Sequence, residues 1–500
     1  MSQQMMPNEQ PEQSLSELLQ IRRDKLAALQ EAGQDPFTIT KYEVTHHSNE
    51  VKDNFDALEG QTVRVAGRLM SKRGMGKAVF GDLQDKAGRV QLYVRIDDVG
   101  EETLARFKKC DIGDIIGVEG EVFRTKRGEI SVKAKDFTLL SKSLRPLPEK
   151  FHGLTDVETR CRQRYVDLIM NPDVKRNFVI RSQFIKYVRD FMDKRGFMEV
   201  ETPVLNTISG GATARPFITH HNTLDIDMYM RIATELPLKR LIVGGLERVY
   251  EMGRIFRNEG MDNRHNPEFT TIELYQAYAD FNDMMDLFED LLSGAAQEIL
   301  GTYQVEWQGE QIDLTPGWPR MPMHEAVKQH TGLDFMAITS DEEAVAAARS
   351  IGVELPETAD KTWGNALYEV FDQRVESKLI QPTFITMHPV DVSPLAKRSP
   401  ADPRLTERFE LFICHSEMGN AFSELNDPID QRQRFQKQVE LRAKGDDEAG
   451  MMDEDFLNAL EYGMPPTGGL GIGIDRCVML LTNNDSIREV LLFPTMKPLD

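Results

Sequence analysis

The sequence predicts a multidomain α+β protein, in which a small N-terminal β-barrel precedes a larger antiparallel β-sheet flanked by helices. The chain has 500 residues, enough for about three domains of ~150 residues each. Short alternating segments fill residues 61–145, whereas the rest mixes strands and helices without the regular βα alternation of a parallel sheet. We therefore expect a tail and helical arm at 1–60, a barrel at 61–145, a linker at 146–165 and a large domain at 166–500.

The composition is typical of a globular chain without membrane spans. Hydrophobic residues make up 40% and charged residues 28% of the sequence, and no apolar run approaches the ~20 residues that a membrane helix needs. Residues 1–14 are polar, lack the features of a signal peptide and are expected to be disordered. The cysteines are far apart and form no CxxC pair, so a cytoplasmic location fits best.

Positive charge is concentrated in the barrel segment. The whole chain has a net charge of −21, which argues against a nucleic-acid platform over its entire surface. Residues 61–150 hold 19 Lys and Arg against 13 Asp and Glu, a net charge of +6 that leaves −27 for the remainder. The sequence thus places one basic module on an acidic body.

A helical arm is predicted at residues 15–32. Leucines recur there at near-helical spacing, Arg22, Arg23 and Lys25 lie between them, and Gly33 is a natural stop. Two roles stay open for this arm, packing on the body of the protein and contact with RNA, because charges on a helix usually mark a solvated face.

Five short strands are predicted in the barrel segment. Their expected ranges are 62–69, 78–83, 89–95, 114–123 and 130–139. Glycines punctuate them, and this pattern suits a small closed barrel, although spacing alone does not identify its type. Pro146 and Pro148 then mark residues 144–151 as a stiff linker.

Three fragments of the large domain together supply what a nucleoside triphosphate needs. They read FRNE at 256–259, RHNPEF at 264–269 and GLGIGIDR at 469–476. Their arginines offer charge for phosphates, Phe269 offers a flat face for a base, and the glycine-rich strand allows close backbone approach. The sequence has no GxGxxG loop or Walker A motif, so a Rossmann or P-loop nucleotide site has no support.

These fragments resemble motifs 2 and 3 of the class II aminoacyl-tRNA synthetases, and the residues around them resemble the bacterial type of lysyl-tRNA synthetase. The resemblance covers residues 51–498 and implies that the barrel is an OB-fold and the large domain the class II catalytic domain. The implied reaction is ATP-dependent activation of L-lysine to lysyl-adenylate, with release of pyrophosphate, followed by transfer to the 3′ end of tRNA(Lys).

A helix at residues 176–195, a strand at 197–202 and Pro203 resemble motif 1, which implies a homodimer. Without the resemblance, this pattern indicates no more than an ordinary core helix and strand. Gly196 separates the two elements.

The resemblance also implies roles at the ATP end of the site. In the activation step a carboxylate attacks the α-phosphorus of ATP, so cations must offset two anions. By resemblance, Arg257, Glu259 and Arg476 are the catalytic residues. The implied ATP-binding set is Arg257, Glu259, Arg264, His265, Phe269 and Arg476.

Glu410 and Glu417 match the family's metal carboxylates and imply Mg²⁺ bound together with ATP. Mg²⁺ takes one or two carboxylates together with phosphate oxygens and water. The two glutamates are seven residues apart, so a strand, a turn and a second strand must bring them together. Without the resemblance they read as surface glutamates.

The choice of lysine is expected to depend on carboxylates, because an ammonium group sheds its water only against paired anions. Glu273 and Glu424 match the family's acids for the side-chain ammonium, with Tyr275 adding a hydroxyl and Phe422 a wall for the aliphatic stem. The α-amino and carboxylate end is assigned, by the same resemblance, to Gly211, Glu235 and Asn420.

In the barrel, Arg73, Phe80, Gln91 and Glu129 match the positions that contact the anticodon of tRNA in this family. An aromatic face stacks any base, and Arg, Gln and Glu side chains can recognise the edges of unstacked bases. A lone Phe in a barrel is otherwise more often part of the core.

Three alternatives share part of this pattern. An aspartyl or asparaginyl synthetase has the same scaffold, but Glu273 and Glu424 would repel aspartate. A lysyltransferase that modifies a translation factor lacks the barrel domain. A catalytically inactive synthetase-like module would have lost some of the charged set, which is complete here: Arg257, Glu259, Glu410, Glu417 and Arg476.

Overall fold

The fold was analysed in a computed structural model that describes residues 15–74, 76–148, 154–356, 360–445 and 448–499. The chain divides into two compact units, Met1–Thr155 and Asp156–Asp500. The boundary falls inside the range expected for the linker. The expected tail at 1–14 and residues 149–153 of the linker lie outside the described residues.

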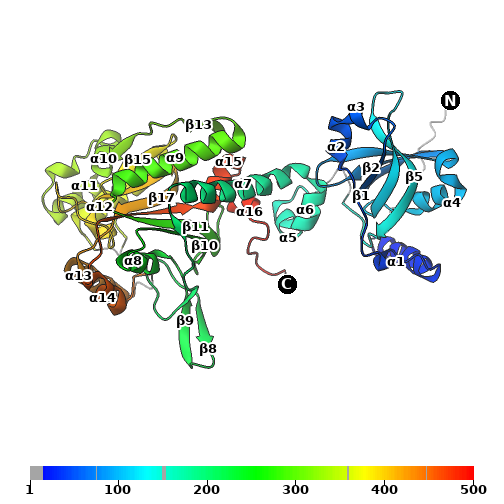
Figure 1. The fold of residues 1–500 in the computed structure, drawn as a ribbon. Helices are drawn as coiled ribbons and strands as arrows, with labels where there is room; N and C mark the ends of the chain where they lie inside the picture. The colour runs from blue at the N-terminus through cyan, green and yellow to red at the C-terminus, as the bar shows by residue number, and fades with distance from the viewer. Residues whose placement is uncertain (1–14, 75, 149–153, 357–359, 446–447, 500) are drawn as a thin grey trace, which may run out of the picture. The chain divides into compact units, whose positions relative to one another are not determined.

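The first unit consists of five strands and several helices (Figure 1). Its elements are α1 (Leu15–Glu31), a 3-10 turn (Pro36–Thr38), α2 (Ser48–Asp53), α3 (Phe55–Leu58), β1 (Thr62–Arg73), β2 (Ala78–Gln84), β3 (Arg89–Arg95), α4 (Ile96–Lys109), β4 (Ile115–Arg124) and β5 (Ile130–Ser141). The strands close on one another in the order β1-β2-β3-β5-β4. All five lie close to their predicted bounds, whereas α4 was not predicted.

Strict alternation along the strands builds the interior of this unit. On β3, Val90, Leu92 and Val94 are buried, and the residues between them face outward. The β3–β5 pair is parallel and the other pairs are antiparallel. Helix α4 adds Leu104 and Phe107 to the same core, and therefore packs against the barrel interior.

The helical arm α1 packs on the barrel. The Arg22 guanidinium is buried and donates to the carbonyls of Ser143, at 2.9 Å, and Ile112, at 3.0 Å. The Lys25 ammonium lies 2.6 Å from a carboxylate oxygen of Asp111. The arm therefore packs on the body of the protein, which was one of the two roles left open for it. Contact with RNA stays a prediction.

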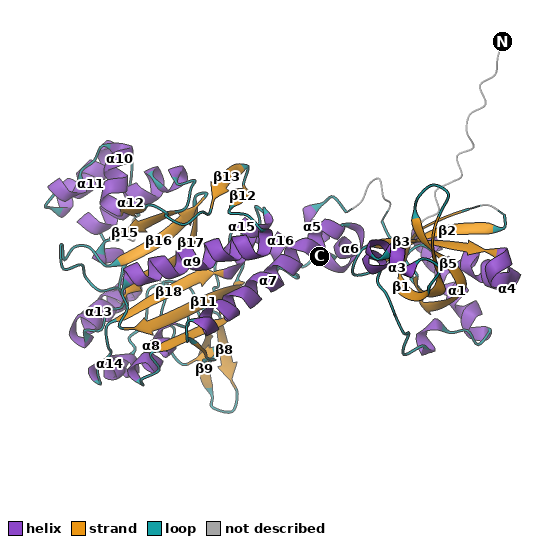
Figure 2. Cartoon of the chain, turned by 45° about the horizontal axis from the view of Figure 1, so that its top comes forward, coloured by secondary structure: helices purple, strands orange, loops and turns teal. Residues whose placement is uncertain are grey.

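The second unit is a large sheet covered by helices (Figure 2). Its helices are α5 (Val157–Arg162), α6 (Arg164–Met170), α7 (Pro172–Lys194), α8 (Glu235–Val243), α9 (Phe281–Leu300), α10 (Met323–Thr331), α11 (Asp341–Ser350), α12 (Trp363–Arg374), α13 (Pro428–Ala443), α14 (Glu454–Glu461), α15 (Ile474–Thr482) and α16 (Ile487–Val490), with 3-10 turns at Phe335–Ala337, Glu376–Lys378 and Val390–Val392. Helix α5 begins inside the range expected for the linker.

The strands of this unit form one eight-stranded sheet and two small sheets. They are β6 (Met198–Glu199), β7 (Leu205–Asn206), β8 (Ile218–His221), β9 (Ile226–Met230), β10 (Arg248–Phe256), β11 (Glu268–Ala277), β12 (Gln304–Trp307), β13 (Glu310–Asp313), β14 (Arg320–Pro322), β15 (Thr383–Thr386), β16 (Arg408–Ile413), β17 (Ser416–Ser423) and β18 (Thr467–Gly473). The large sheet has the order β14-β15-β16-β17-β18-β11-β10-β6.

The expectation of a purely antiparallel sheet needs correction, because the sheet is mixed. The inner strands, β15 to β10 in sheet order, pair antiparallel, but each edge strand pairs parallel with its neighbour: β14 with β15 and β6 with β10. Both edge strands are short, and each is joined to its partner by a long connection, as parallel pairing requires: helices between β14 and β15, and β7–β9 with α8 between β6 and β10. The strand expected at 197–202 is limited to β6, whereas the helix expected at 176–195 is present as α7.

Helices α7 and α9 close one face of the sheet, whereas α8 and α14 cover part of the opposite face, which also carries the polar side chains. Helix α9 begins at a cap in which Asp280 accepts the N–H groups of Asn282 and Asp283, and its apolar side packs on the sheet together with α7. Ile272 and Leu274 of β11 enter this core. Alternation turns the residues between and beside them to the opposite face. Among the described residues, no helix is both long and apolar enough to cross a membrane.

Candidate active site

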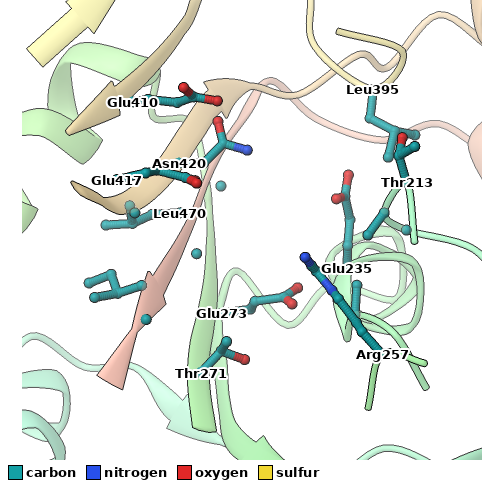
Figure 3. Close-up of a pocket in the computed structure, with 18 of the residues that line it drawn as sticks. Thr213, Glu235, Arg257, Thr271, Glu273, Leu395, Glu410, Glu417, Asn420 and Leu470 are labelled. Atoms are coloured by element: carbon teal, nitrogen blue, oxygen red, sulfur yellow. The ribbon is translucent and has the colours of Figure 1, made fainter. Parts of the chain in front are cut away.

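A pocket of about 480 Å³ lies on the open face of the large sheet (Figure 3). Figure 3 shows Glu410, Glu417 and Asn420 together on one side, with Glu235, Glu273 and Arg257 on the other. Every site residue predicted in the C-terminal domain lines this pocket, namely Gly211, Glu235, Arg257, Glu259, Arg264, His265, Phe269, Glu273, Tyr275, Glu410, Glu417, Asn420, Phe422, Glu424 and Arg476. The structure thus brings together residues that are far apart in the sequence.

A hairpin positions the first cation of the pocket. Strands β10 and β11 pair antiparallel, and Arg257 follows β10 directly, where its N–H donates to the carbonyl of Pro267 at 2.9 Å. Its guanidinium carbon lies 5.3 Å from the centre of the Phe269 ring on β11. A cation and an aromatic face therefore share one end of the pocket.

Two further arginines approach from the other side of this end. Arg476, at the start of α15, donates to the carbonyl of Glu417 at 2.5 Å, and its second terminal nitrogen lies 3.3 Å from His265 Nε2. Arg264 donates to the carbonyl of His415 at 3.0 Å. These contacts hold three positively charged groups around the open pocket, an arrangement suited to a polyanion.

Glu410 and Glu417 are brought together by two strands and a tight turn. Glu410 lies on β16 and Glu417 on β17, and the turn between them places Cys414 and His415 at φ 48° and 55°. A strand, turn and strand is the arrangement that their spacing required. Among the described residues, no group of three or more His, Cys, Asp or Glu side chains could hold a metal ion.

Three glutamates converge on the side of the pocket where Figure 3 shows Glu235 and Glu273. Glu235 begins α8, Glu273 lies on β11 and Glu424 directly follows β17; Glu235 and Glu424 are 7% and 1% exposed. Burial, with Glu235 nearby, raises the pKa of Glu273 to about 7. Burial also raises the pKa of Glu235 and Glu424 above the ordinary value, although Lys239 opposes the shift. This end of the pocket is therefore short of positive charge.

Close backbone approach forms the floor beneath these glutamates. A Cβ on Gly469 would lie 2.0 Å from Glu424 Oε1 and 2.5 Å from Cε1 of Tyr275. Only glycine fits where β18 passes under the acids. Gly211, at the rim, has a φ of 88°, which other residues rarely adopt. The Tyr275 hydroxyl lies 3.5 Å from Glu273 Oε2.

Sequence reasoning missed two basic residues of this site. Arg408 lines the pocket and donates to Asn420 Oδ1 at 3.0 Å and to Glu410 Oε1 at 2.6 Å. Lys239 is fully buried and forms ion pairs with Glu235 and Glu424. Both were within reach of sequence reasoning, because Arg408 is two residues before Glu410 on one strand and Lys239 is one helical turn after Glu235.

In the first unit, three of the predicted base-contacting residues lie on adjacent strands. Arg73 on β1 pairs with Phe80 on β2. Gln91 on β3 accepts a hydrogen bond from Ser131 at 3.1 Å. Glu129 precedes β5 and is exposed, 3.8 Å from Lys52.

Phe80 is half-buried, lies on the outer face of the sheet and is not part of the barrel core. The structure therefore excludes the alternative that Phe80 is a core residue. Its ring centre lies 4.8 Å from that of Tyr93, which in turn lies 5.8 Å from that of Phe123. Sequence reasoning missed these two partners, although both occupy outward positions of the strand alternation. The three rings together form a half-exposed aromatic strip.

The family model for tRNA synthetases class II (D, K and N) matches residues 156–497, and the model for the OB-fold nucleic acid binding domain matches residues 63–140. Lysine–tRNA ligase from Pelotomaculum thermopropionicum is 60% identical over 487 residues, which cover 97% of this chain and 96% of the relative. The enzymes of the same name from Clostridium perfringens and Moorella thermoacetica are each 59% identical, over 97% of this chain and 97% and 98% of the relative. These matches confirm the predicted family and the OB-fold domain. The chain belongs to the class II tRNA synthetases of the D, K and N group, and within that group to the lysine–tRNA ligases.

Proposed function

We propose that this protein activates L-lysine with ATP to form lysyl-adenylate and pyrophosphate, and then transfers lysine to the 3′ end of tRNA(Lys). The observation that carries the choice of lysine is the cluster of buried Glu235 and Glu424 with half-buried Glu273, beside the arginines of the same pocket. A substrate that presents ammonium groups to the acids and its carboxylate toward the cations fits this polarity.

ATP occupies the cationic end in this proposal. Arg257 holds the α-phosphate, and Arg264 and His265 reach the β- and γ-phosphates. Phe269 stacks one face of the adenine and Arg476 covers the other, as a planar guanidinium can. The charge that develops on the α-phosphate during attack is then stabilised by groups already in place.

Glu259 completes the proposed ATP site. It lies at the exposed rim of the pocket, two residues after Arg257. We place it among the catalytic residues with Arg257 and Arg476.

Mg²⁺ fits the carboxylates at this end. Glu410 and Glu417 supply two hard oxygen ligands, and ATP phosphates and water complete the shell that Mg²⁺ prefers. When bound, the ion offsets phosphate charge and holds the triphosphate in one geometry. Arg408 fixes the Glu410 carboxylate, and Arg476 holds the backbone of Glu417.

The amino acid occupies the acidic end. Glu273, Tyr275 and Glu424 receive the side-chain ammonium, and Phe422 walls the aliphatic stem. The α-amino and carboxylate groups lie toward Gly211, Glu235 and Asn420. The two bound substrates then meet where the acidic and cationic ends of the pocket adjoin.

The OB-fold domain binds the anticodon in this proposal. The strip of Phe80, Tyr93 and Phe123 stacks unpaired bases, and Arg73 and Gln91 beside it, with Glu129, read their edges. The domain's net positive charge draws the tRNA backbone to it.

We further propose a homodimer and a cytoplasmic location. The segment that resembles motif 1 contains α7 and β6, and this resemblance supports a dimer. The four free, buried cysteines suit a reducing compartment. Sedimentation checks the assembly: dimers are expected, and a fully active monomer at nanomolar concentration contradicts the proposal.

Amino-acid-dependent exchange of pyrophosphate into ATP tests the activity, with each amino acid supplied separately. Lysine should support exchange, and aspartate and asparagine should not, because Glu273 and Glu424 need a side chain that carries a cation. Exchange that depends on aspartate or asparagine would overturn the assignment. Exchange with lysine but no charging of tRNA would restrict the proposal to the first step.

A further inference from the structure

Lys239 lies directly behind the acidic end of the pocket. It is the fifth residue of α8, one turn after Glu235, and its side chain is fully buried. Its ammonium bridges Glu235 Oε1 and Glu424 Oε2. The ring of Phe422, whose centre lies 5.3 Å from the ammonium nitrogen, covers it further. Lys239 itself is not among the residues that line the pocket.

The two carboxylates are shared between Lys239 and the pocket. Glu235 and Glu424 both line the pocket, so each joins the buried ammonium behind it to the open space in front. Among the described residues, Glu424 Oε1 has no hydrogen-bond partner, and it faces the glycine floor at Gly469. A buried carboxylate oxygen without a hydrogen-bond partner is unfavourable, and a donor bound in the pocket would stabilise it.

We propose that Lys239 is a positioning residue, a resident counter-ion that fixes Glu235 and Glu424 and sets the net charge of the amino-acid pocket. The inference rests on the proposed function and deepens it. Glu235, Glu273 and Glu424 carry three negative charges when ionised, and Lys239 offsets one of them. The two that remain equal the charge of two ammonium groups, which a diamino acid supplies and a monoamino acid does not.

The other charged groups around Lys239 do not replace it. On neighbouring elements these are Glu273, Tyr275, Arg257, Arg408, Arg240 and Asp453. Arg408 is engaged with Glu410 and Asn420, and Arg240 pairs with Asp453 at 2.9 Å. Arg257 lies beside the Phe269 ring and close enough to Glu273 to oppose the rise in the pKa of that carboxyl. Among the described residues, Lys239 is thus the cation that contacts Glu424.

The acid–base behaviour of the cluster agrees with this role. Burial alone would lower the pKa of Lys239, but Glu235 and Glu424 raise it above the ordinary value, so the ammonium stays charged. Without that charge, the buried carboxylates would take up protons at neutral pH. A protonated carboxyl no longer pairs with the substrate ammonium, so lysine would bind only after a proton is lost.

The test is the KM for lysine in pyrophosphate exchange, measured from pH 6.0 to 8.5 at saturating ATP and Mg²⁺ with Lys239→Met. In the wild type, the KM for lysine should rise below a certain pH. In Lys239→Met we expect that pH to be higher by one unit or more. At pH 7 the KM for lysine should then be about tenfold or more above wild type, since one pKa unit is a factor of ten. The KM for ATP should stay within about twofold.

Arg240→Met is the matched control. It removes a cation and its ion pairs from the same helix, but on the side that faces Asp453 and Asp455. Its KM for lysine and the pH dependence should match wild type. A purely structural role for Lys239 would lower kcat in Lys239→Met through loss of folded enzyme, without moving the pH dependence of the KM.

Lys239→Gln guards against a folding defect, since it keeps a donor for the carboxylates and loses only the charge. It should show the same upward shift. If either variant folds and binds lysine with the wild-type pH dependence, the proposal is wrong. If neither folds, Lys239 is a structural residue and the proposal is also wrong. Wild-type protein without lysine-dependent exchange would instead contradict the proposed function.

Discussion

Each unit of the molecule buries a lysine between two carboxylates, and the two clusters differ in how completely they are satisfied. In the first unit, Lys142 lies 2.9 Å from both oxygens of Asp114 and 2.5 Å from Asp111. Backbone N–H groups of Asp111 and Ser143 also donate to Asp114, and Lys25 donates to Asp111. Every oxygen of these two carboxylates has a donor.

The cluster in the second unit is left incomplete. Lys239 is shared by Glu235 and Glu424, Glu273 adds a third acid, and Glu424 Oε1 has no partner among the described residues. The pKa values diverge accordingly. Burial acts to raise the pKa of Asp111, but hydrogen bonds from Lys142 and Lys25 hold it below the ordinary value, whereas Glu273 rises to about 7.

This difference separates a structural ion pair from a binding site. A fully paired buried cluster stabilises the fold once its two partners are present. A cluster short of cations costs stability in the free protein, and a cationic ligand that completes it recovers that cost. The sequence singled out Glu235, Glu273 and Glu424 by resemblance but did not show that they would lack partners.

The largest effect is expected from breaking the satisfied cluster. Lys142→Met leaves the buried Asp114 without its cation and Asp111 with Lys25 alone, which should destabilise the first unit by about 3–5 kcal/mol. The three tryptophans, Trp307, Trp318 and Trp363, all lie in the second unit. Urea unfolding followed by circular dichroism should therefore show an earlier transition that tryptophan fluorescence does not report.

Lysine-dependent pyrophosphate exchange by Lys142→Met should stay within about twofold of wild type. If the substitution moves the transitions seen by circular dichroism and by tryptophan fluorescence equally, the two units unfold as one. Loss of exchange in the folded variant would show that the first unit contributes to activation itself.

Breaking the incomplete cluster should have a smaller energetic effect but remove function. Glu424→Gln keeps the shape of the side chain and leaves the substrate ammonium poorly compensated, at a cost of about 2–4 kcal/mol. Lysine activation should fall about a hundredfold or more, since ~1.4 kcal/mol is a factor of ten. ATP affinity, measured by calorimetry, should change little because Arg257, Phe269 and Arg476 are untouched. Near-wild-type lysine kinetics would exclude Glu424 as the specificity residue.

The barrel surface should affect transfer and not activation. Phe80→Ala removes one ring of the aromatic strip, and loss of base stacking costs about 1–3 kcal/mol. The KM for tRNA in aminoacylation should rise about tenfold, while pyrophosphate exchange without tRNA is unchanged. Phe37→Ala, at an exposed ring outside the strip, is the control. Equal effects of the two substitutions would remove the strip from tRNA binding.

The raised pKa of Glu273 should produce a modest pH dependence of lysine binding. The folded protein holds the Glu273 proton up to pH ~7, whereas the unfolded chain loses it near the ordinary value. Stability of the free protein should therefore fall as pH rises between these values. Bound ammonium favours the ionised form, so lysine should bind about tenfold more weakly at pH 6 than at pH 8. Calorimetric titration with lysine alone measures this change, and a constant Kd over that range would contradict it.

The strands of the barrel were predictable from local side-chain alternation, and the site residues were predictable from the family's sequence motifs. Alternation with glycine punctuation fixed the five barrel strands to within a few residues, since the side-chain period of a strand is set by its geometry. Helix α4 was missed because its segment contains Gly100, which interrupts the helical pattern at φ 82°. The edge strand β14 was missed because three residues are too few for a pattern, and the strand expected at 197–202 shrank to the two residues of β6.

Within the site, motif resemblance found the residues that face the pocket and missed those that hold them. Lys239 does not line the pocket, and Arg408 acts by fixing Glu410 and Asn420. Tyr93 and Phe123 show their role only once the register places their rings beside Phe80. These contacts depend on tertiary pairing, which a local pattern does not contain.

In the proposed function, Glu273 and Glu424 of the incomplete cluster select lysine by the charge of its side chain. The most direct test compares kcat/KM for lysine and for norleucine in pyrophosphate exchange, because norleucine keeps the aliphatic stem and lacks the terminal ammonium. A site built around a buried polar partner rejects an analogue without it by about 10⁴-fold, and we expect a ratio of that order. Activation of norleucine within about tenfold of lysine would contradict the account.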